Sequence, residues 1–220
     1  MPNNPGNLFK QYALILICPL LLIVCIFPKT TSFVAANIYH CTFLDQLFTY
    51  YTWVGDGLFV IALAIILFFV KQRVLAWKLC ISFLFSGLIA QILKSLFHAP
   101  RPKTFFAESF YHHFIEGVTH GGNASFPSGH SATAFAAAAI LSFNCSKKST
   151  CIIAFWMAAL VGYSRMYLGQ HFLEDVLAGI ITGISSAIFI EYIFKLYLTR
   201  VRAAKAPSTV PYEQPAVIRL

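Results

Sequence analysis

Six long apolar runs alternate with short polar connections along this chain. The runs cover residues 8–27, 54–70, 75–97, 131–143, 151–163 and 172–198. A helix needs about 20 apolar residues to cross the hydrocarbon core of a bilayer, and most of the runs approach that length. The fourth run is short, but it reaches about 16 residues when it is counted from Ser128. The pattern predicts an all-α, integral membrane bundle of six transmembrane helices.

The bulk composition supports this interpretation. The chain is 58% hydrophobic and 11% charged, with a mean hydropathy of +0.71, whereas soluble domains contain about a quarter charged residues. No polar linker divides the runs, so residues 1–202 are expected to form one transmembrane domain. Residues 203–220, with three prolines, are expected to form a disordered cytoplasmic tail. The first run also fits a signal peptide, but no small-x-small cleavage site follows it, which favours an uncleaved helix.

The net charge of +8 does not indicate nucleic-acid binding, because the cations lie mainly in the short connections between apolar runs. If the N-terminus is cytoplasmic, the cytoplasmic segments hold eleven Lys and Arg residues and the opposite side holds five. Short cytoplasmic segments are enriched in Lys and Arg. We therefore expect a multi-pass membrane protein with both termini cytoplasmic, in the inner membrane if the source is bacterial. The five outer cations are Lys29, Lys94, Arg101, Lys103 and Arg165.

This topology places three polar clusters at the extracytoplasmic end of the bundle. In the first, Lys94 and Arg101 are seven residues apart and share a helix face if the helix continues that far. An ammonium and a forked guanidinium suit a phosphate. The alternative is that both side chains are interfacial anchors.

The second cluster is Ser128-Gly129-His130, which precedes an apolar run. Ser128 can cap the helix that follows, and Gly129 allows close approach to the backbone. The free N–H groups of a helix start bind anions. The alternative is a simple cap and turn with an interfacial His130.

The third cluster contains Arg165, His171 and Asp175. His171 and Asp175 are four residues apart, which places them on one face of the sixth helix. A carboxylate that accepts from Nδ1–H leaves Nε2 basic, as in an activated nucleophile. Arg165 can reach the same phosphate oxygens as the cations of the first cluster. His130 has no carboxylate at helical spacing, so it is the better candidate for the proton donor. The alternative is an interfacial salt bridge.

Together these residues resemble the three signatures of the type 2 phosphatidic acid phosphatase superfamily, which includes membrane lipid phosphatases and vanadium haloperoxidases. The resemblance implies that His171 is the nucleophile, Asp175 its orienting carboxylate and His130 the general acid. It also implies that no metal or cofactor is needed, since fixed cations hold the phosphate. The matching segments are Lys94-x6-Arg101-Pro102, Pro127-Ser128-Gly129-His130 and Ser164-Arg165-x5-His171-x3-Asp175. The phosphate ligands implied are Lys94, Arg101, Ser128, Gly129 and Arg165.

The expected function is hydrolysis of a lipid phosphate monoester or diphosphate through a phosphohistidine, with the lipid entering from the bilayer. Transfer of the phosphoryl group to another lipid, or vanadate-dependent halide oxidation, are the alternatives. A channel or transporter is disfavoured because the charges gather at helix ends rather than at the midplane. Undecaprenyl diphosphate, phosphatidylglycerol phosphate, phosphatidic acid and lipid A all remain candidate substrates.

Several other features carry weaker expectations. The six cysteines have no C-x-x-C or zinc spacing, so no structural disulfide is expected. Residues 28–52 are expected to be a polar-aromatic connection. Glu108, His112, Glu116 and His120 recur at intervals of four residues, with His113 beside them, and on a helix they would form a stripe able to bind a metal. Glycines in the same segment argue against a continuous helix, so residues 103–126 are expected to be a loop.

Three further positions are assigned to local structure. Gly179 and Gly183 are expected to allow close helix packing within the chain rather than dimerisation. Glu191 and Lys195 are expected to form a local pair. Asp56 is expected to be stabilised by the start of the helix that follows it, with a possible second role beside the polar site.

Overall fold

The computed structural model describes residues 4–106, 111 and 113–205, and every regular element in these ranges is a helix. The all-α prediction is confirmed. The elements are α1 (Pro5–Ile26), α2 (Lys29–Ala36), α3 (Thr42–Tyr51), a 3-10 turn η1 (Thr52–Gly55), α4 (Gly57–Phe69), α5 (Arg73–Phe97), α6 (Pro102–Phe105), α7 (Gly129–Asn144), α8 (Lys148–Tyr167) and α9 (Leu173–Lys205).

Four of the described helices, α1, α5, α8 and α9, are long and apolar enough to cross a membrane. A fifth candidate span is the pair α3–η1 and α4, which bends by 54° at its break. Large apolar side chains such as Leu14, Leu84 and Ile188 face outward from these helices. An outward-facing apolar surface on long helices requires a lipid environment, so the chain is an integral membrane protein. A six-span count stays a prediction.

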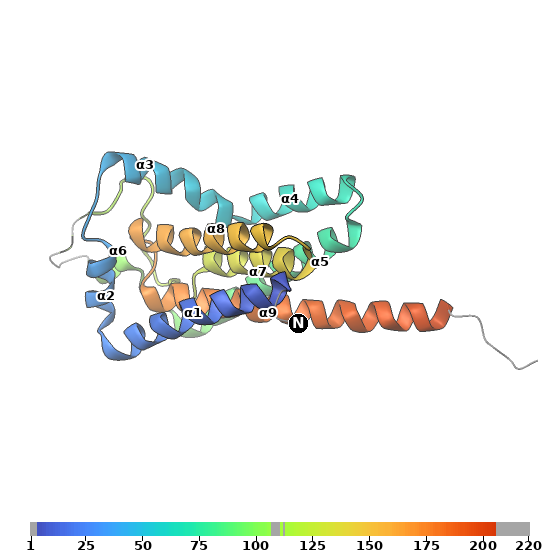
Figure 1. The fold of residues 1–220 in the computed structure, drawn as a ribbon. Coiled ribbons are helices and arrows are strands. Elements are labelled where there is room, and N and C mark those ends of the chain that lie inside the picture. Colours follow the sequence, from blue (N-terminus) through green and yellow to red (C-terminus); the bar gives the residue numbers. More distant parts are fainter. Residues whose placement is uncertain (1–3, 107–110, 112, 206–220) are drawn as a thin grey trace, which may run out of the picture.

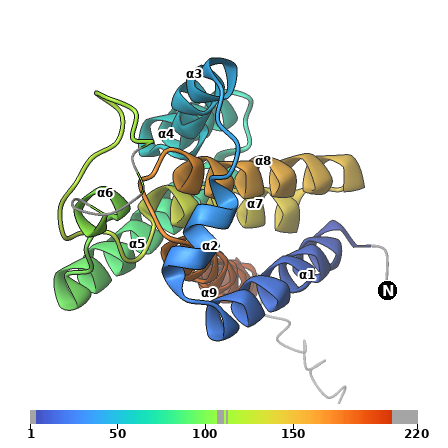
Figure 2. The same ribbon diagram turned by 90° about the vertical axis from the view of Figure 1, so that its left-hand side faces the viewer.

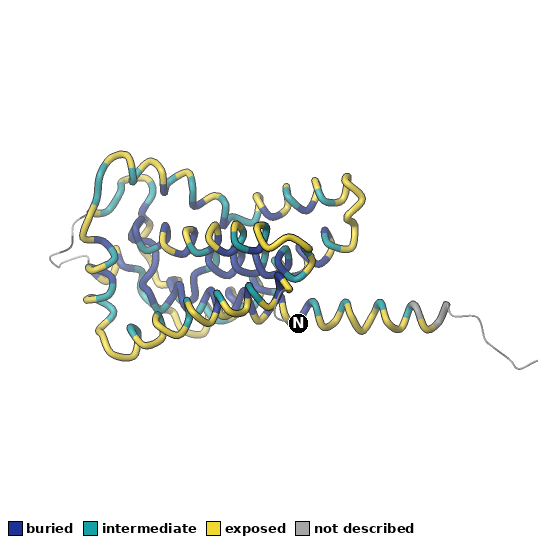
Figure 3. Tube along the Cα trace, viewed as in Figure 1, coloured by how far each residue is buried: buried dark blue, intermediate teal, exposed yellow. Residues whose placement is uncertain are grey.

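Helix α7, which corresponds to the fourth run, forms the centre of the bundle. It packs against α9, α8, α5 and α1, and Figure 3 shows it buried along most of its length. Its many alanines let neighbouring backbones come close. A Cβ on Gly179 or Gly183 of α9 would lie only 2.5 or 2.3 Å from the carbonyl oxygens of Ser128 and Ala132. The glycine pair therefore packs inside the chain, as expected.

The connection expected over residues 28–52 is instead largely helical, with α2 and α3. The reason is an apolar stripe at helical spacing in α3, formed by Leu44, Phe48 and Tyr51, which packs on the end of α8. The ring centroids of Phe48 and Tyr167 lie 4.8 Å apart. Asp56 ends this helical stretch and caps α4, because its Oδ1 accepts from the Leu58 N–H at 2.8 Å.

The expected pair between Glu191 and Lys195 is wrong. Lys78 of α5 reaches Glu191 at 2.5 Å and also donates to Asn144 Oδ1 at 2.7 Å. Lys78 is 7% exposed. A buried ammonium takes the nearest carboxylate, whereas Lys195 lies on the exposed side of α9.

The N-terminal helix begins at the end of the bundle from which α9 projects (Figure 1). The opposite end carries α2, α6 and the connections before α7 and α9 (Figures 1 and 2). Residues 203–205 belong to α9 rather than to a tail. The predicted disorder of residues 206–220 lies outside the described residues.

Candidate active site

Lys94 and Arg101, the first cluster, do not lie on one continuous helix, contrary to what their spacing suggested. Lys94 lies in the last turn of α5, which ends at Phe97 with His98 in the left-handed region (φ 44°). Arg101 is therefore not on the same helix. Its backbone N–H donates to the Gly122 carbonyl at 2.8 Å, and its Nη1 donates to Oε1 of Gln170 at 2.5 Å. The loop, rather than helical spacing, brings Arg101 to the site.

The start of α7 lies beside Lys94. A methyl group on Gly129 would lie 3.9 Å from Lys94 Nζ. Ser128 caps α7, since its Oγ accepts from the Ser131 N–H, and its own N–H donates to the Asp175 carbonyl at 2.9 Å. The starts of α7 and α9 are thus joined through their backbones.

His171 and Asp175 are both buried, at 2% and 1% exposure. His171 Nδ1 lies 3.5 Å from Asp175 Oδ2. The two residues do not share a helix, as the sequence suggested, because α9 begins only at Leu173. Instead, Asp175 folds back over the start of α9, where its Oδ2 accepts from the Phe172 N–H at 2.9 Å. That capping contact turns the carboxylate toward His171.

Ser125 completes this group and was not found from the sequence. Its Oγ donates to Asp175 Oδ2 at 2.5 Å and lies 3.4 Å from His171 Nδ1. Burial lowers the pKa of His171 to about 4, an effect that the hydrogen bond to Asp175 opposes. His171 is therefore neutral at pH 7, and the neighbouring acceptors favour the tautomer with hydrogen on Nδ1.

Arg165 lies in the last turn of α8 and is 8% exposed. Its Nη1 donates to Thr52 Oγ1 at 2.8 Å, while its Nε is buried without a hydrogen-bond partner among the described residues. A buried guanidinium with a free donor is unusual, because unpaired buried polar groups are costly.

His130 lies in the first turn of α7, where burial and then the charges of Arg165, Lys94 and Arg101 lower its pKa to about 3. Its Nε2 is 4.0 Å from Asp56 Oδ2. Asp56 thus caps α4 and also faces the polar site, so both roles considered for it are compatible with the structure.

A cleft of about 180 Å³ opens beside His130, lined by Thr52, Trp53, Asp56, Leu58 and His130. Trp53 and Leu58 at its mouth are 66% and 73% exposed. The side of the bundle at this point is therefore apolar outside and polar inside.

The structure brings the eight residues predicted for the site to one end of the bundle. Three further residues of the site were not predicted from the sequence. They are Ser125, Gln170 and Thr52, which bond Asp175, Arg101 and Arg165, respectively. Nothing in their local pattern distinguishes them from other polar residues in connections. Of the metal-capable stripe, Glu108 and His112 lie outside the described residues, and Glu116 and His120 are exposed in non-helical backbone.

Comparison with known proteins agrees with this geometry. Residues 75–198 match the PAP2 superfamily. The chain is 30% identical over 163 residues to phosphatidylglycerophosphatase B of Bacillus subtilis, which covers 68% of this chain and 75% of that protein. It is 32% identical over 152 residues to a lipid A 1-phosphatase of Rhizobium etli, which covers 60% of this chain and 63% of that protein, just under two thirds.

Among solved structures, LpxE of Aquifex aeolicus superposes with a TM-score of 0.65 at 31% identity, covering 73% of this chain and 92% of that one. The membership that the three signatures suggested is thereby confirmed. Sequence, fold and relatives agree: the chain belongs to the PAP2 superfamily.

Proposed function

We propose that the protein is a membrane lipid phosphatase that hydrolyses a phosphate monoester or diphosphate of a lipid through a phosphohistidine at His171. The observation that carries this proposal is the buried His171–Asp175–Ser125 group beside Lys94, Arg101 and Arg165. Phosphoryl transfer requires mainly positioning and charge stabilisation, and this arrangement provides both.

In the first step, Nε2 of neutral His171 attacks phosphorus in line with the leaving oxygen. The P–O bond breaks as the N–P bond forms, and His130 donates its proton to the departing lipid alkoxide or phosphate. For His130 to carry that proton, the negative charge of the bound phosphate must raise its pKa, which is otherwise low. Asp175, held by Ser125 and by the Phe172 N–H, stabilises the positive charge that develops on the imidazole.

In the second step, neutral His130 takes a proton from water, and the water oxygen attacks phosphorus. The N–P bond breaks, phosphate leaves, and both histidines return to their starting states. In the proposed mechanism, the guanidinium groups of Arg165 and Arg101 and the ammonium of Lys94 hold the phosphate oxygens in both steps; their mutual proximity and the unpartnered Nε of Arg165 among the described residues support this assignment. These cations supply the charge stabilisation, so the proposed reaction needs no metal.

The cleft beside His130 supports a lipid substrate. Exposed Trp53 and Leu58 flank its mouth on the apolar side of the bundle, so an acyl or prenyl chain can stay in the bilayer while its phosphate reaches His130. The names of the relatives suggest phosphatidylglycerol phosphate and the lipid A phosphates as substrates to test first.

The proposal includes a membrane orientation. With α7 counted as a span and α3–η1–α4 as one bent span, the chain crosses six times. The excess of Lys and Arg then places both termini in the cytoplasm and the site on the extracytoplasmic side. Labelling of single cysteines placed at Gly122 and at Lys195 by a membrane-impermeant maleimide, in a background without native cysteines, tests this. Labelling of the Lys195 position from outside would contradict it.

Catalysis is tested by phosphate release from a panel of lipid phosphates in detergent. His171→Ala and His130→Ala should abolish release, while His120→Ala, an exposed histidine outside the site, should retain it. Vanadate should inhibit and chelators should not. Rapid quench of a ³²P-labelled substrate reaction into alkaline SDS should trap label on the protein, and this label should be stable in alkali and lost in acid, as expected for phosphohistidine. Strict dependence on Mg²⁺, or full activity of His171→Ala, would refute the mechanism.

A further inference from the structure

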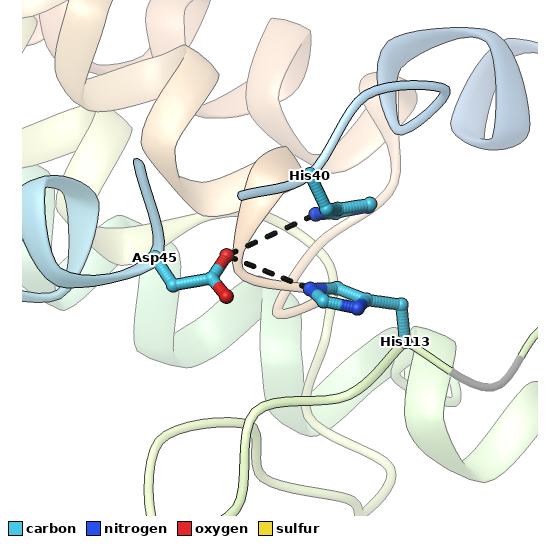
Figure 4. A group of neighbouring side chains, drawn as sticks. All are labelled: His40, Asp45 and His113. Carbon is cyan, nitrogen blue, oxygen red and sulfur yellow. Dashed lines mark ion pairs between the residues drawn. The ribbon is translucent and has the colours of Figure 1, made fainter. Parts of the chain in front are cut away.

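A second group of ionisable side chains lies at the same end of the bundle as the catalytic cluster. His40 lies in the connection between α2 and α3, Asp45 in the first turn of α3, and His113 in the segment that precedes α7. Figure 4 shows both imidazole rings turning a nitrogen toward the same carboxylate oxygen. His40 Nδ1 is 4.0 Å and His113 Nε2 is 3.5 Å from Asp45 Oδ1. One ligand atom from each residue lies within 4.8 Å of the other two.

Two tyrosines surround this group. The Tyr167 hydroxyl donates to Asp45 Oδ1 at 2.6 Å, and the Tyr111 hydroxyl is hydrogen-bonded to His40 Nε2 at 3.2 Å. With Nε2 occupied, His40 presents Nδ1 to the carboxylate, yet Nδ1 is buried and has no hydrogen-bond partner among the described residues. Metal-binding histidines commonly bond their second nitrogen to an outer partner, and ligating carboxylates are hydrogen-bonded in turn.

We propose that His40, Asp45 and His113 bind a divalent transition-metal ion of the zinc type, at a site separate from the phosphate site. Two imidazoles and one carboxylate are a ligand set that Zn²⁺ accepts, with water in the fourth position. The ligand atoms around a tetrahedral Zn²⁺ lie about 3.3 Å apart, given bonds of about 2.0–2.1 Å. Binding requires the two imidazole rings, now 3.6 Å apart at an interplanar angle of 30°, to rotate apart so that the lone pairs in their planes meet at the ion. The His113 side chain is 40% exposed, which leaves a path for the ion and the water.

A metal-free role for the cluster explains less. A carboxylate shared by Tyr167 and two histidines would tie the connections together, but among the described residues it leaves the buried Nδ1 of His40 without a well-formed hydrogen bond, although the Asn37 backbone lies near the ring. Each ring turns one nitrogen toward Asp45, as Figure 4 shows, and the two ring centroids lie 3.6 Å apart at an interplanar angle of 30°. An ion between them satisfies Nδ1 and the remaining lone pair of His113 together.

The consequence of such a site is local stability. Tyr167 belongs to the last turn of α8, two residues beyond Arg165. The segment after His113 is bonded to the same region, because Thr119 Oγ1 donates to the Leu168 carbonyl at 2.8 Å. An ion would fasten α3 and the segment that carries His113 over the end of α8. This inference does not depend on the proposed hydrolase function.

The test uses the full chain, purified in detergent through a tag without histidines and then treated with EDTA. Zn²⁺ binding is measured by elemental analysis and by competition with a chromophoric chelator, and thermal unfolding is followed with and without Zn²⁺. The wild type and the matched control His120→Ala should bind one Zn²⁺ and show a higher unfolding midpoint with the ion. In His40→Ala, His113→Ala and Asp45→Asn, this binding and this shift should be lost.

Loss of an outer partner typically weakens a metal site about 10–100-fold, so Tyr111→Phe should raise the Kd for Zn²⁺ within that range, and His113→Ala by at least as much. His113→Ala is the mildest test of folding, because the side chain is the most exposed of the three. Unchanged Zn²⁺ affinity in folded His113→Ala, or no binding by the wild type, would overturn the proposal. Phosphate release, measured well below the unfolding midpoint, should continue after EDTA treatment, which separates this result from failure of the catalytic mechanism.

Discussion

Ser125 donates a 2.5 Å hydrogen bond from its Oγ to Oδ2 of Asp175, the same oxygen that faces His171 Nδ1. The three side chains come from the loop before α7, the connection before α9 and the first turn of α9. Ser125 is fully buried, so this bond is shielded from water. Ser125 is a positioning residue that holds the carboxylate against the nucleophile.

Replacing Ser125 with alanine should lower kcat about 10–100-fold. A hydrogen bond to a charged group contributes about 1.5–3 kcal/mol, and each 1.4 kcal/mol is about tenfold in rate. KM should change less, because Ser125 does not touch the phosphate in the proposed mechanism. Steady-state kinetics on a short-chain lipid phosphate in detergent measures both constants.

The control is Ser142→Ala. Ser142 is also a fully buried serine, but it lies near the far end of α7 and donates to the Ala138 carbonyl at 2.7 Å. It should retain wild-type kcat. Equal losses in the two variants would mean that Ser125 acts only through folding.

Gln170→Leu should weaken phosphate binding. Oε1 of Gln170 accepts from Arg101 Nη1 at 2.5 Å, and its amide donates to the Val118 carbonyl, so it fixes Arg101 between two connections. Without it we expect the Ki for vanadate to rise about tenfold, equivalent to about 1.4 kcal/mol. Gln91→Leu, which alters an exposed glutamine of α5, is the control and should leave the Ki unchanged.

The pH profile reports the state of His171. Burial lowers its pKa to about 4, compared with about 6.5 for an ordinary imidazole. A lowered pKa keeps the nucleophile neutral as the pH falls, so the acidic limb of kcat/KM that belongs to His171 should lie near pH 4 rather than near 6.5. The substrate phosphate also ionises, so the profile is measured with two substrates whose phosphates have different pKa values. An acidic limb near pH 6.5 with both substrates would contradict the prediction.

Gly183→Ala should destabilise the bundle and lower activity. Its new Cβ would lie 2.3 Å from the Ala132 carbonyl oxygen and 2.9 Å from the Ala136 nitrogen, both backbone atoms that cannot rotate away. Helix α9 must then move from α7, which displaces Asp175 from the site. Gly87→Ala on α5 is the matched control, because nothing lies within 4 Å of its Cβ position. It should be neutral or slightly stabilising, since alanine favours helix over glycine by about 0.5–1 kcal/mol.

Lys78→Met should lower the thermal stability without reducing the activity of the folded protein. The change leaves Glu191 and Asn144 without the ammonium that bonds both. Removing one member of a buried ion pair costs about 3–5 kcal/mol. Lys195→Met should have a far smaller effect. Thermal unfolding in detergent checks both, and equal midpoints for the two variants would contradict the structural assignment.

The sequence predicted the membrane character, the six apolar helical stretches and the residues of the three clusters. Apolar runs of spanning length have few alternatives in lipid, because every backbone group must be bonded within the helix. Because successive spanning helices run in opposite directions, Lys94, His130 and Arg165 must lie at the same end of the bundle, whatever the details of helix packing. Ser128 was recognisable as a cap from its position before an apolar run, and the structure has it there.

The tertiary structure decided what local spacing leaves open. Arg101 reaches the site from a loop, Glu191 pairs with Lys78 rather than Lys195, and His40 meets His113 from far along the chain. Ser125 and Gln170 carry no local pattern that marks them, because their roles depend on partners about 50 and 70 residues away. Hydrophobic periodicity determines which segments become helices. Contacts between the connections depend on where the packed helices place their ends, and no short segment of the sequence specifies that placement.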